Sequence, residues 1–150
     1  MKRLIFIFIP LALLIASCKG QKITKEKVPS LVFNSLKAKY PVATDIDWKK
    51  QGTIYEAELD INDSTEVSLR IDEAGNLLMQ KSDILLTELP QVINAAVQRQ
   101  YAAYTIDDVE KIEQDGGIYY QVELKAKGKK EVNIVFSADG KEVKNPAYWD

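Results

Sequence analysis

The chain contains the same strand-like segment twice, and this repeat constrains the fold more than any other feature. GTIYEAEL at residues 52–59 returns 65 residues later as GIYYQVEL at residues 117–124. Matches on both sides extend the repeat over two units, residues 28–86 and 89–150. One such unit of about 60 residues would bury only about 60% of its unfolded surface. We therefore expect the two copies to share a core or to extend one sheet.

Each unit opens with a helical pattern. Apolar residues recur every four positions in both units, as Val28, Val32, Leu36 and Tyr40 and then as Leu89, Ile93, Val97 and Tyr101. This period predicts a helix with one buried face. Pro29 and Pro90 stand where a helix begins and a missing N–H costs little. Pro41 predicts the end of the first helix.

Alternating apolar and polar residues follow each helix. IYEAELDI at residues 54–61 and EVSLRI at residues 66–71 show this alternation, and the second unit repeats it. A period of two predicts antiparallel strands with one face covered and one face in water. Gly75 and Gly140 end short polar segments that predict hairpin turns. The pattern as a whole predicts an α+β protein, a tandem repeat of a helix plus an antiparallel four-stranded sheet.

The same residues resemble a known family. The first unit is similar to the PepSY-like, beta-lactamase-inhibitor-like domains of exported Bacteroidetes lipoproteins through Tyr40-Pro41, Asp47-Trp48, Tyr55-Glu56-Ala57 and Asp72-Glu73-Ala74-Gly75. The second follows through Leu89-Pro90, Tyr119-Tyr120 and Ala138-Asp139-Gly140, with Ile112 or Val109 in place of Trp48. The resemblance implies tandem helix-on-sheet repeats and no established catalysis. Because related domains are linked to inhibition of peptidases or of beta-lactamases, the resemblance also implies an inhibitor as a possible function. No residue of this sequence can be matched to either activity.

The beginning of the chain resembles a bacterial lipoprotein signal. Lys2 and Arg3 precede an apolar run over residues 4–16, and thirteen helical residues would span about 20 Å, less than the ~30 Å hydrocarbon core. Ile15-Ala16-Ser17-Cys18 resembles a lipobox. We therefore expect a signal peptide over residues 1–17 and lipidation of Cys18. The alternative is a signal peptide that carries a cysteine near its cleavage site by chance.

The segment after the cysteine has its own expectation. Residues 18–27 are rich in lysine and poor in apolar side chains, which predicts a flexible lipidated tether. Lys19 directly after the cysteine resembles the sorting signal of lipoproteins that move to the outer membrane. The expected location is therefore the outer membrane, lipid-anchored and facing the periplasm.

Composition removes several classes of function. The sequence has no histidine and one cysteine, so a lipidated Cys18 leaves no thiol for a disulfide, a zinc site or a nucleophile. Histidine-dependent acid/base chemistry and the common zinc sites are also removed. Without residues 1–17 the chain has 18 basic and 22 acidic residues, a net charge of −4, which argues against nucleic acid as a partner. We expect a protein that is not an enzyme and uses no metal or cofactor.

Two acidic patterns have both a functional and a simpler interpretation. Glu56 and Glu58 are expected about 7 Å apart on the exposed face of one strand, a spacing that can serve a glycosidase. Alternating charge on an exposed strand needs no chemistry, and this is the favoured interpretation. DINDSTE at residues 60–66 has oxygens spaced as in a calcium loop, but Thr65 and Ile71 stand where such a loop needs glycine and a carboxylate. A polar hairpin turn is expected there.

The exposed sheet face is the remaining candidate site. Tyr119 is expected to point outward with Val135 as a neighbour, and an exposed tyrosine beside apolar residues can be a contact hot spot. The predicted partner-binding residues are Glu56, Glu58, Arg70, Tyr119, Gln121 and Glu123. They predict a non-catalytic periplasmic module that binds a protein or peptide, with sheet edges as further acceptors. The alternative is an inhibitor of a specific peptidase or beta-lactamase. Tyr148 and Trp149 are expected either to cap the second sheet's core or to form an adhesive end.

Overall fold

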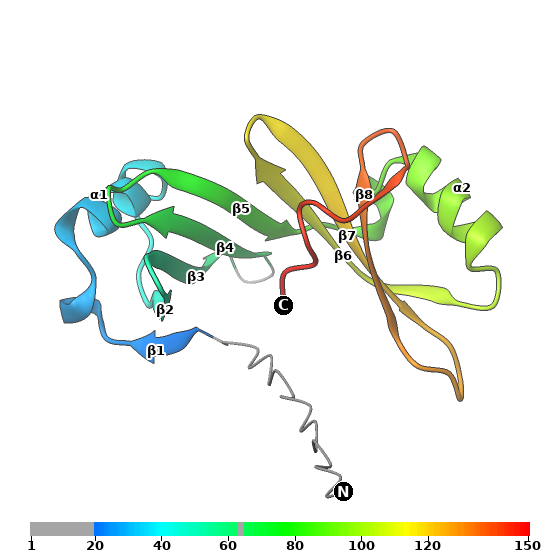
Figure 1. Cartoon of the computed structure of the whole chain (residues 1–150), viewed down its shortest axis with the longest axis horizontal. Helices are drawn as coiled ribbons and strands as arrows, with labels where there is room; N and C mark the ends of the chain where they lie inside the picture. The colour runs from blue at the N-terminus through cyan, green and yellow to red at the C-terminus, as the bar shows by residue number, and fades with distance from the viewer. Residues whose placement is uncertain (1–19, 63–64) are drawn as a thin grey trace, which may run out of the picture.

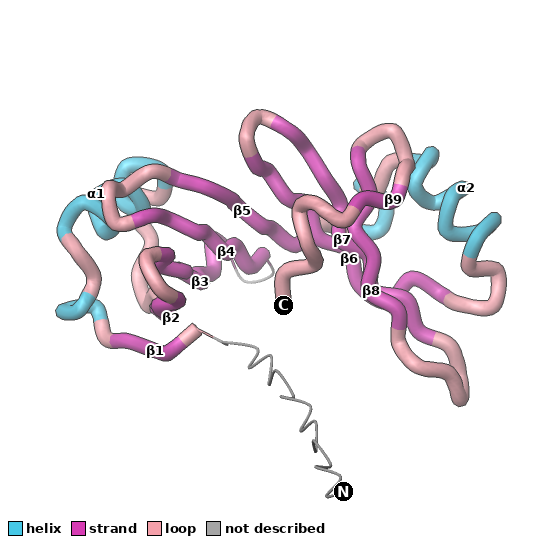
Figure 2. Tube along the Cα trace, viewed as in Figure 1, coloured by secondary structure: helices cyan, strands magenta, loops and turns pink. Residues whose placement is uncertain are grey.

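All strands that the structure describes form one antiparallel sheet. The structure, a computed structural model, describes residues 20–62 and 65–150. Its nine strands follow one another in chain order across the sheet (Figures 1 and 2). They are β1 Gln21–Ile23, β2 Asp47–Gln51, β3 Ile54–Asn62, β4 Thr65–Asp72, β5 Leu77–Asp83, β6 Thr105–Gln114, β7 Gly117–Lys125, β8 Val132–Ser137 and β9 Glu142–Val143. The expected signal peptide and Cys18 lie outside the described residues.

Two helices complete the fold, one for each repeat. They are α1 Ser30–Lys39 and α2 Gln91–Gln100, and single 3-10 turns at Lys25–Lys27 and Leu86–Glu88 precede them. The helices lie at opposite ends of the molecule in Figure 1, and the last residues of the chain run between the two halves. The predicted pattern of one helix followed by antiparallel strands, twice, is therefore confirmed.

Each helix buries its apolar stripe against its own strands. Val32 and Leu36 of α1 are fully buried over Trp48, Tyr55, Ala57, Leu59, Val67, Leu69 and Ile71. Ile93, Ala96 and Val97 of α2 are buried over Val109, Val122, Leu124, Ile134 and Phe136. These are two separate apolar clusters, and all of their strand residues lie on the same side of the sheet. We call this side the helix face.

The two repeats use the same devices at equivalent places. Gly75 has a φ of 85° and Gly140 a φ of 80°, a region that favours glycine. A Cβ on Gly75 would lie 2.9 Å from the Ser35 hydroxyl of α1, and one on Gly140 would lie 2.8 Å from the Val92 side chain of α2. Both turns therefore need glycine, for its conformation and for the close approach of the helix.

The register also settles which residue replaces Trp48 in the second repeat. Trp48 pairs with Ala57, and Val109 pairs with Val122, which is the repeat equivalent of Ala57. Val109 lies in the core under α2, whereas Ile112 is buried on the opposite side of the sheet. Val109 is thus the counterpart of Trp48.

The four-stranded sheet expected in each repeat is not confirmed, and of the two arrangements expected for the pair, a shared core or one extended sheet, the structure shows the extended sheet. β5 pairs with β6 from Met79 opposite Gln114 to Asp83 opposite Glu110, so one sheet runs through both repeats. Pairing the last strand of one repeat with the first long strand of the next satisfies backbone groups that would otherwise form two exposed edges.

The flexible-tether expectation also fails for the part of that segment that is described. Gln21–Ile23 form β1, which pairs with β2 through Gln21 opposite Lys50 and Ile23 opposite Trp48. Ile23 and Val28 pack against the first core. Backbone hydrogen bonds to a strand edge depend little on side-chain type, so a lysine-rich composition did not reveal this strand.

Candidate functional site

The six predicted binding residues lie on the side of the sheet opposite the helices, which we call the polar face. In the register Glu56 stands opposite Arg70 and Glu58 opposite Ser68, while Gln121 stands opposite Val135. These positions alternate with the residues of the two cores. Tyr119 and Glu123 flank Gln121 on the same side of β7, because side chains two apart share a face.

The centre of the polar face is covered by the chain itself. The covering segment is residues 146–150, which we call the tail, and it follows β9 (Figure 2). Trp149 of the tail is 1% exposed, and Val135 of β8, expected to be outward and exposed, is only 3% exposed. The expectation that Tyr148 and Trp149 cap the second core or form an adhesive end is wrong for Trp149, which is buried on the opposite face.

The indole of Trp149 is held by charged side chains of the first repeat. Its Nε1–H donates to Glu56 Oε2 at 2.9 Å. The Arg70 guanidinium lies 4.0 Å from the ring centroid, and the Lys81 ammonium lies 5.4 Å from it. Arg70 Nε also donates to Glu56 Oε2 at 3.1 Å, so one carboxylate fixes both the ring and the cation that stacks on it. Such cation–π contacts strengthen where water is displaced.

The backbone of Trp149 is held mainly by the second repeat. Its N–H donates to Gln121 Oε1, and its carbonyl accepts from Gln121 Nε2 at 3.1 Å and from Lys81 Nζ at 3.0 Å. The side-chain amide of Gln121 therefore binds the tail through one acceptor and one donor, as a peptide group of a neighbouring strand would. Gln121 is 1% exposed, so its hydrogen bonds are shielded from water.

A buried ion pair supports this arrangement at the junction of the repeats. Lys81 Nζ of β5 lies 2.6 Å from Glu110 Oε1 of β6, and their side chains are only 12% and 11% exposed. Glu110 Oε2 also accepts from Gln121 Nε2 at 2.6 Å. Burial and the nearby carboxylates, Glu110 first among them, raise the pKa of Tyr148 above its ordinary value. The site therefore keeps the Tyr148 hydroxyl neutral.

The structure brings some predicted residues together and leaves others at the margin. Glu56, Arg70 and Gln121 converge on Trp149. Glu58 instead pairs with Lys49 at 3.0 Å, and Glu123 pairs with Lys125 at 2.5 Å. Tyr119 is half-buried with its ring folded over Gly117. We call the contact set Glu56, Arg70, Lys81 and Gln121 the Trp149 cradle.

Sequence reasoning missed three residues of this site, Lys81, Glu110 and Trp149. Lys81 and Glu110 lie on β5 and β6, whose pairing joins the repeats, and no repeat signal points to that pairing. The tail carried the one usable signal, a tryptophan in a short segment beyond the last repeated strand.

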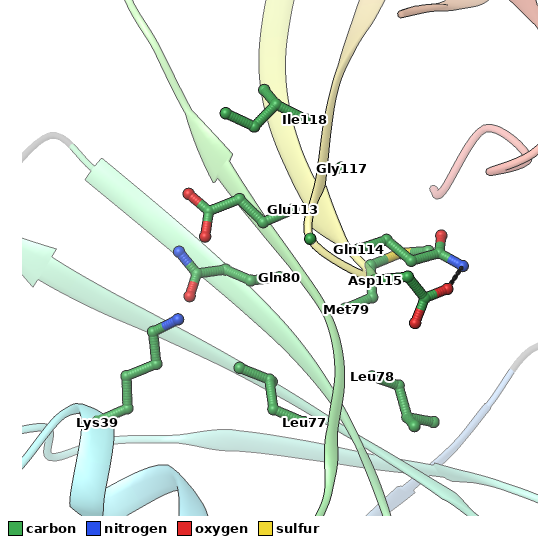
Figure 3. A pocket seen from close by; sticks show the side chains of 11 residues that line it. Lys39, Leu77, Leu78, Met79, Gln80, Glu113, Gln114, Asp115, Gly117 and Ile118 are labelled. Carbon is green, nitrogen blue, oxygen red and sulfur yellow. Dashed lines mark hydrogen bonds between the residues drawn. The ribbon is translucent and has the colours of Figure 1, made fainter.

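A pocket lies where the two repeats join, near the end of α1. This pocket of about 400 Å³ is open and is lined by Lys39, Leu77, Leu78, Met79, Gln80 and residues 113–118 (Figure 3). A hydrogen bond from Lys111 Nζ, 2.7 Å away, is the main cause that lowers the pKa of Glu113. Glu113 is therefore ionised and unsuited to act as a general acid at neutral pH.

Residues 20–62 and 65–150, the part of the chain that the structure describes, contain no group of three or more carboxylate, histidine or cysteine side chains that could hold a metal ion. The same residues contain no helix long and apolar enough to cross a membrane.

Solved structures share this fold. A protein from Bacteroides eggerthii, described provisionally as periplasmic, superposes with a TM-score of 0.71 at 17% identity, over 78% of this chain and 86% of that one. A DUF2874 family protein from Bacteroides uniformis gives a TM-score of 0.69 at 20% identity, covering 77% and 86%. A protein from Bacteroides fragilis described as BLIP-like gives 0.62 at 28% identity, covering 77% and 83%.

Sequence comparison gives the family directly. No curated protein matches the chain. The profile of a family described as beta-lactamase-inhibitor-like and PepSY-like matches twice, over residues 14–79 and 78–144. The two matches take in both helices and all strands of the sheet. The chain therefore belongs to the PepSY-like, beta-lactamase-inhibitor-like family.

Proposed function

We propose that the chain is a non-catalytic binding module that recognises a protein or peptide through the polar face of its sheet. The observation that carries this proposal is the Trp149 cradle, in which side chains of both repeats hold one aromatic residue by its ring and by its backbone. Aromatic residues in well-packed, desolvated pockets are typical of the centres of protein interfaces.

The short edge strands of the sheet favour its polar face as the contact surface. They argue against a partner that binds by adding a strand at an edge. The edge strand β1 spans Gln21–Ile23 and the edge strand β9 spans Glu142–Val143. β1 and β9 therefore offer few unpaired backbone groups to an incoming peptide. The polar face instead presents charged and amide groups from four long strands, β3, β4, β5 and β7.

The absence of catalysis is part of this proposal. The two carboxylates spaced as in a glycosidase are both engaged, because Glu56 accepts from Arg70 and Trp149 while Glu58 pairs with Lys49. A glycosidase pair would need one of these groups free to donate or accept a proton at a substrate. The net charge of −2 for the whole sequence supports a partner other than nucleic acid.

Three variants test the polar face. Arg70→Glu and Tyr119→Ala alter its centre and its margin, and Arg99→Glu is a matched charge reversal at an exposed residue of α2. Cross-linking in intact cells that produce each full chain should lose the same partner band in the first two variants and keep it in the third. A band unchanged in both polar-face variants would remove this face from the proposal.

A second candidate is inhibition of a specific enzyme, a peptidase or a beta-lactamase. It is supported by the family description and by the 28% identical relative described as BLIP-like. Titrating the purified protein into peptidase and beta-lactamase reactions tests it. Inhibition predicts a rate that falls in proportion to added protein and ends at one equivalent, and flat titrations against both enzyme classes would reject it.

We also propose export and lipid anchoring at Cys18, with the domain facing the periplasm at the outer membrane. The lipobox-like Ile15-Ala16-Ser17-Cys18 and the relative described provisionally as periplasmic support this location. Metabolic labelling with an alkyne fatty acid should mark the natural chain and not a Cys18→Ser variant. Labelling of the Cys18→Ser variant to the same extent as the natural chain would show that the lipid is attached elsewhere.

A further inference from the structure

The tail is bound to the polar face as a ligand is bound to a receptor. The residues that hold Trp149 are remote from it in sequence, 93 positions away for Glu56, 68 for Lys81 and 28 for Gln121. Residues 147–150 form no strand with the sheet, so side chains of the cradle make these contacts. The segment is thus attached through recognition of one residue rather than through a backbone ladder.

The cradle selects one kind of side chain. Glu56 Oε2 accepts from the indole N–H, a donor that phenylalanine lacks and that tyrosine carries at a different position. Arg70 stacks on the ring at 4.0 Å, which requires a flat aromatic face. Gln121 and Lys81 bind the N–H and carbonyl of the same residue, groups that every extended peptide offers. The combined requirement is tryptophan within an extended segment.

The groups of the cradle are held in place by one another as well as by Trp149. Gln121 and Lys81 both contact Glu110, and Arg70 donates to Glu56. If the tail left, these contacts would remain, while Glu56, Lys81 and Gln121 would lose the hydrogen bonds that they make with Trp149. A replacement that supplies an indole N–H and the same backbone groups would restore all of these bonds.

We propose that the Trp149 cradle is a recognition site for a tryptophan in an extended segment of a partner protein, and that Trp149 is an internal occupant which this segment displaces. The inference deepens the proposed function and rests on it for the face that is used. Because the tail is joined to β9 by a short linker, its effective concentration at the cradle is in the millimolar range. The tail therefore competes with any partner segment for the cradle, and only a segment that binds the cradle well displaces it.

A peptide with the tail's own sequence provides the probe. The capped peptide NPAYWD, residues 145–150, carries a fluorescent label and is titrated into the unmodified chain, a Trp149→Ala chain and a control chain with Leu31→Ala at an exposed residue of α1. Emptying the cradle should tighten binding at least tenfold over the unmodified chain, and the control should not change it. Peptides in which tryptophan is replaced by phenylalanine or by 1-methyltryptophan should bind the Trp149→Ala chain at least tenfold more weakly.

Amide exchange in the unmodified chain keeps the test decisive if Trp149→Ala does not fold. Millimolar peptide should accelerate exchange of the Trp149 N–H, which Gln121 holds, and leave the N–H of Ile93 in α2 unchanged. No binding to a folded Trp149→Ala chain, equal binding of the three peptides, or unchanged Trp149 exchange would each overturn the inference. Dimerisation of the unmodified chain through exchanged tails, without binding of free peptide, would also overturn it.

The result separates this inference from the broader proposal. Peptide binding with no polar-face partner in cells would reject the proposed function alone. A partner band that depends on Arg70 and Tyr119, combined with no tryptophan-dependent peptide binding, would reject the tryptophan site alone.

Discussion

The two faces of the sheet are built in different ways. The helix face is built twice, each time from buried residues of one repeat, and its clusters under α1 and α2 consist of apolar side chains. The polar face has one centre, to which both repeats and the tail contribute, and charged and amide groups hold it together. Each repeat therefore carries its own apolar cluster, and the junction of the repeats forms a site that neither repeat contains.

The ion pair at the junction gives the largest expected effect. Lys81→Met should leave Glu110 buried without its cation and lower the free energy of unfolding by about 3–5 kcal/mol. A double variant, Lys81→Met with Glu110→Leu, should recover part of the loss because no uncompensated charge remains. Chemical denaturation measures all three chains. If Lys81→Met lost less free energy of unfolding than the double variant, the polar face would not depend on this pair.

The helix face should respond equally in both repeats. Leu36→Ala and Ile93→Ala each remove a fully buried side chain and should cost about 2–5 kcal/mol. Because the two residues lie in separate clusters, the double variant should be nearly additive. Denaturant midpoints and slopes of the single and double variants test this. Strong non-additivity would contradict the interpretation of two independent cores.

The turn glycines test the equivalence of the repeats at a smaller scale. Gly75→Ala and Gly140→Ala place a side chain at positive φ and against the neighbouring helix, with an expected cost of about 1–3 kcal/mol each. Gly52→Ala is the matched control, with a φ of 60° but no atom within 4 Å of the added Cβ. In thermal unfolding, the control Gly52→Ala should have a higher midpoint than either of the other two variants. Equal losses of stability in all three would show that contact with the helix contributes nothing.

The margin of the polar face should be the least sensitive region. Glu58→Gln removes a partly exposed pair with Lys49 and should cost less than about 1 kcal/mol. The loss should also shrink as salt is added, since exposed charges are screened. Parallel denaturation at low and high salt makes the measurement. A salt-independent loss as large as that of Lys81→Met would place Glu58 in the central site.

Much of the candidate site could be predicted, for a local reason. Alternation along β3, β4 and β7 placed Glu56, Arg70 and Gln121 on one face without any knowledge of the sheet's neighbours. The contact between these residues could not be predicted, because Glu56 and Gln121 meet only through Trp149, far from both in sequence. Lys81 and Glu110 were missed because their approach depends on β5 pairing with β6.

The sequence by itself determined the repeat, its helices, its hairpins and the side to which the residues of β3, β4, β7 and β8 point. These features follow from periodicity and from glycine and proline conformation, which act over a few residues. Only the tertiary structure decided that the repeats share one sheet, that residues 21–23 add an edge strand, and that Trp149 covers the polar face. Backbone pairing is nearly independent of side-chain identity, and the tail's position depends on groups that only the folded sheet brings together.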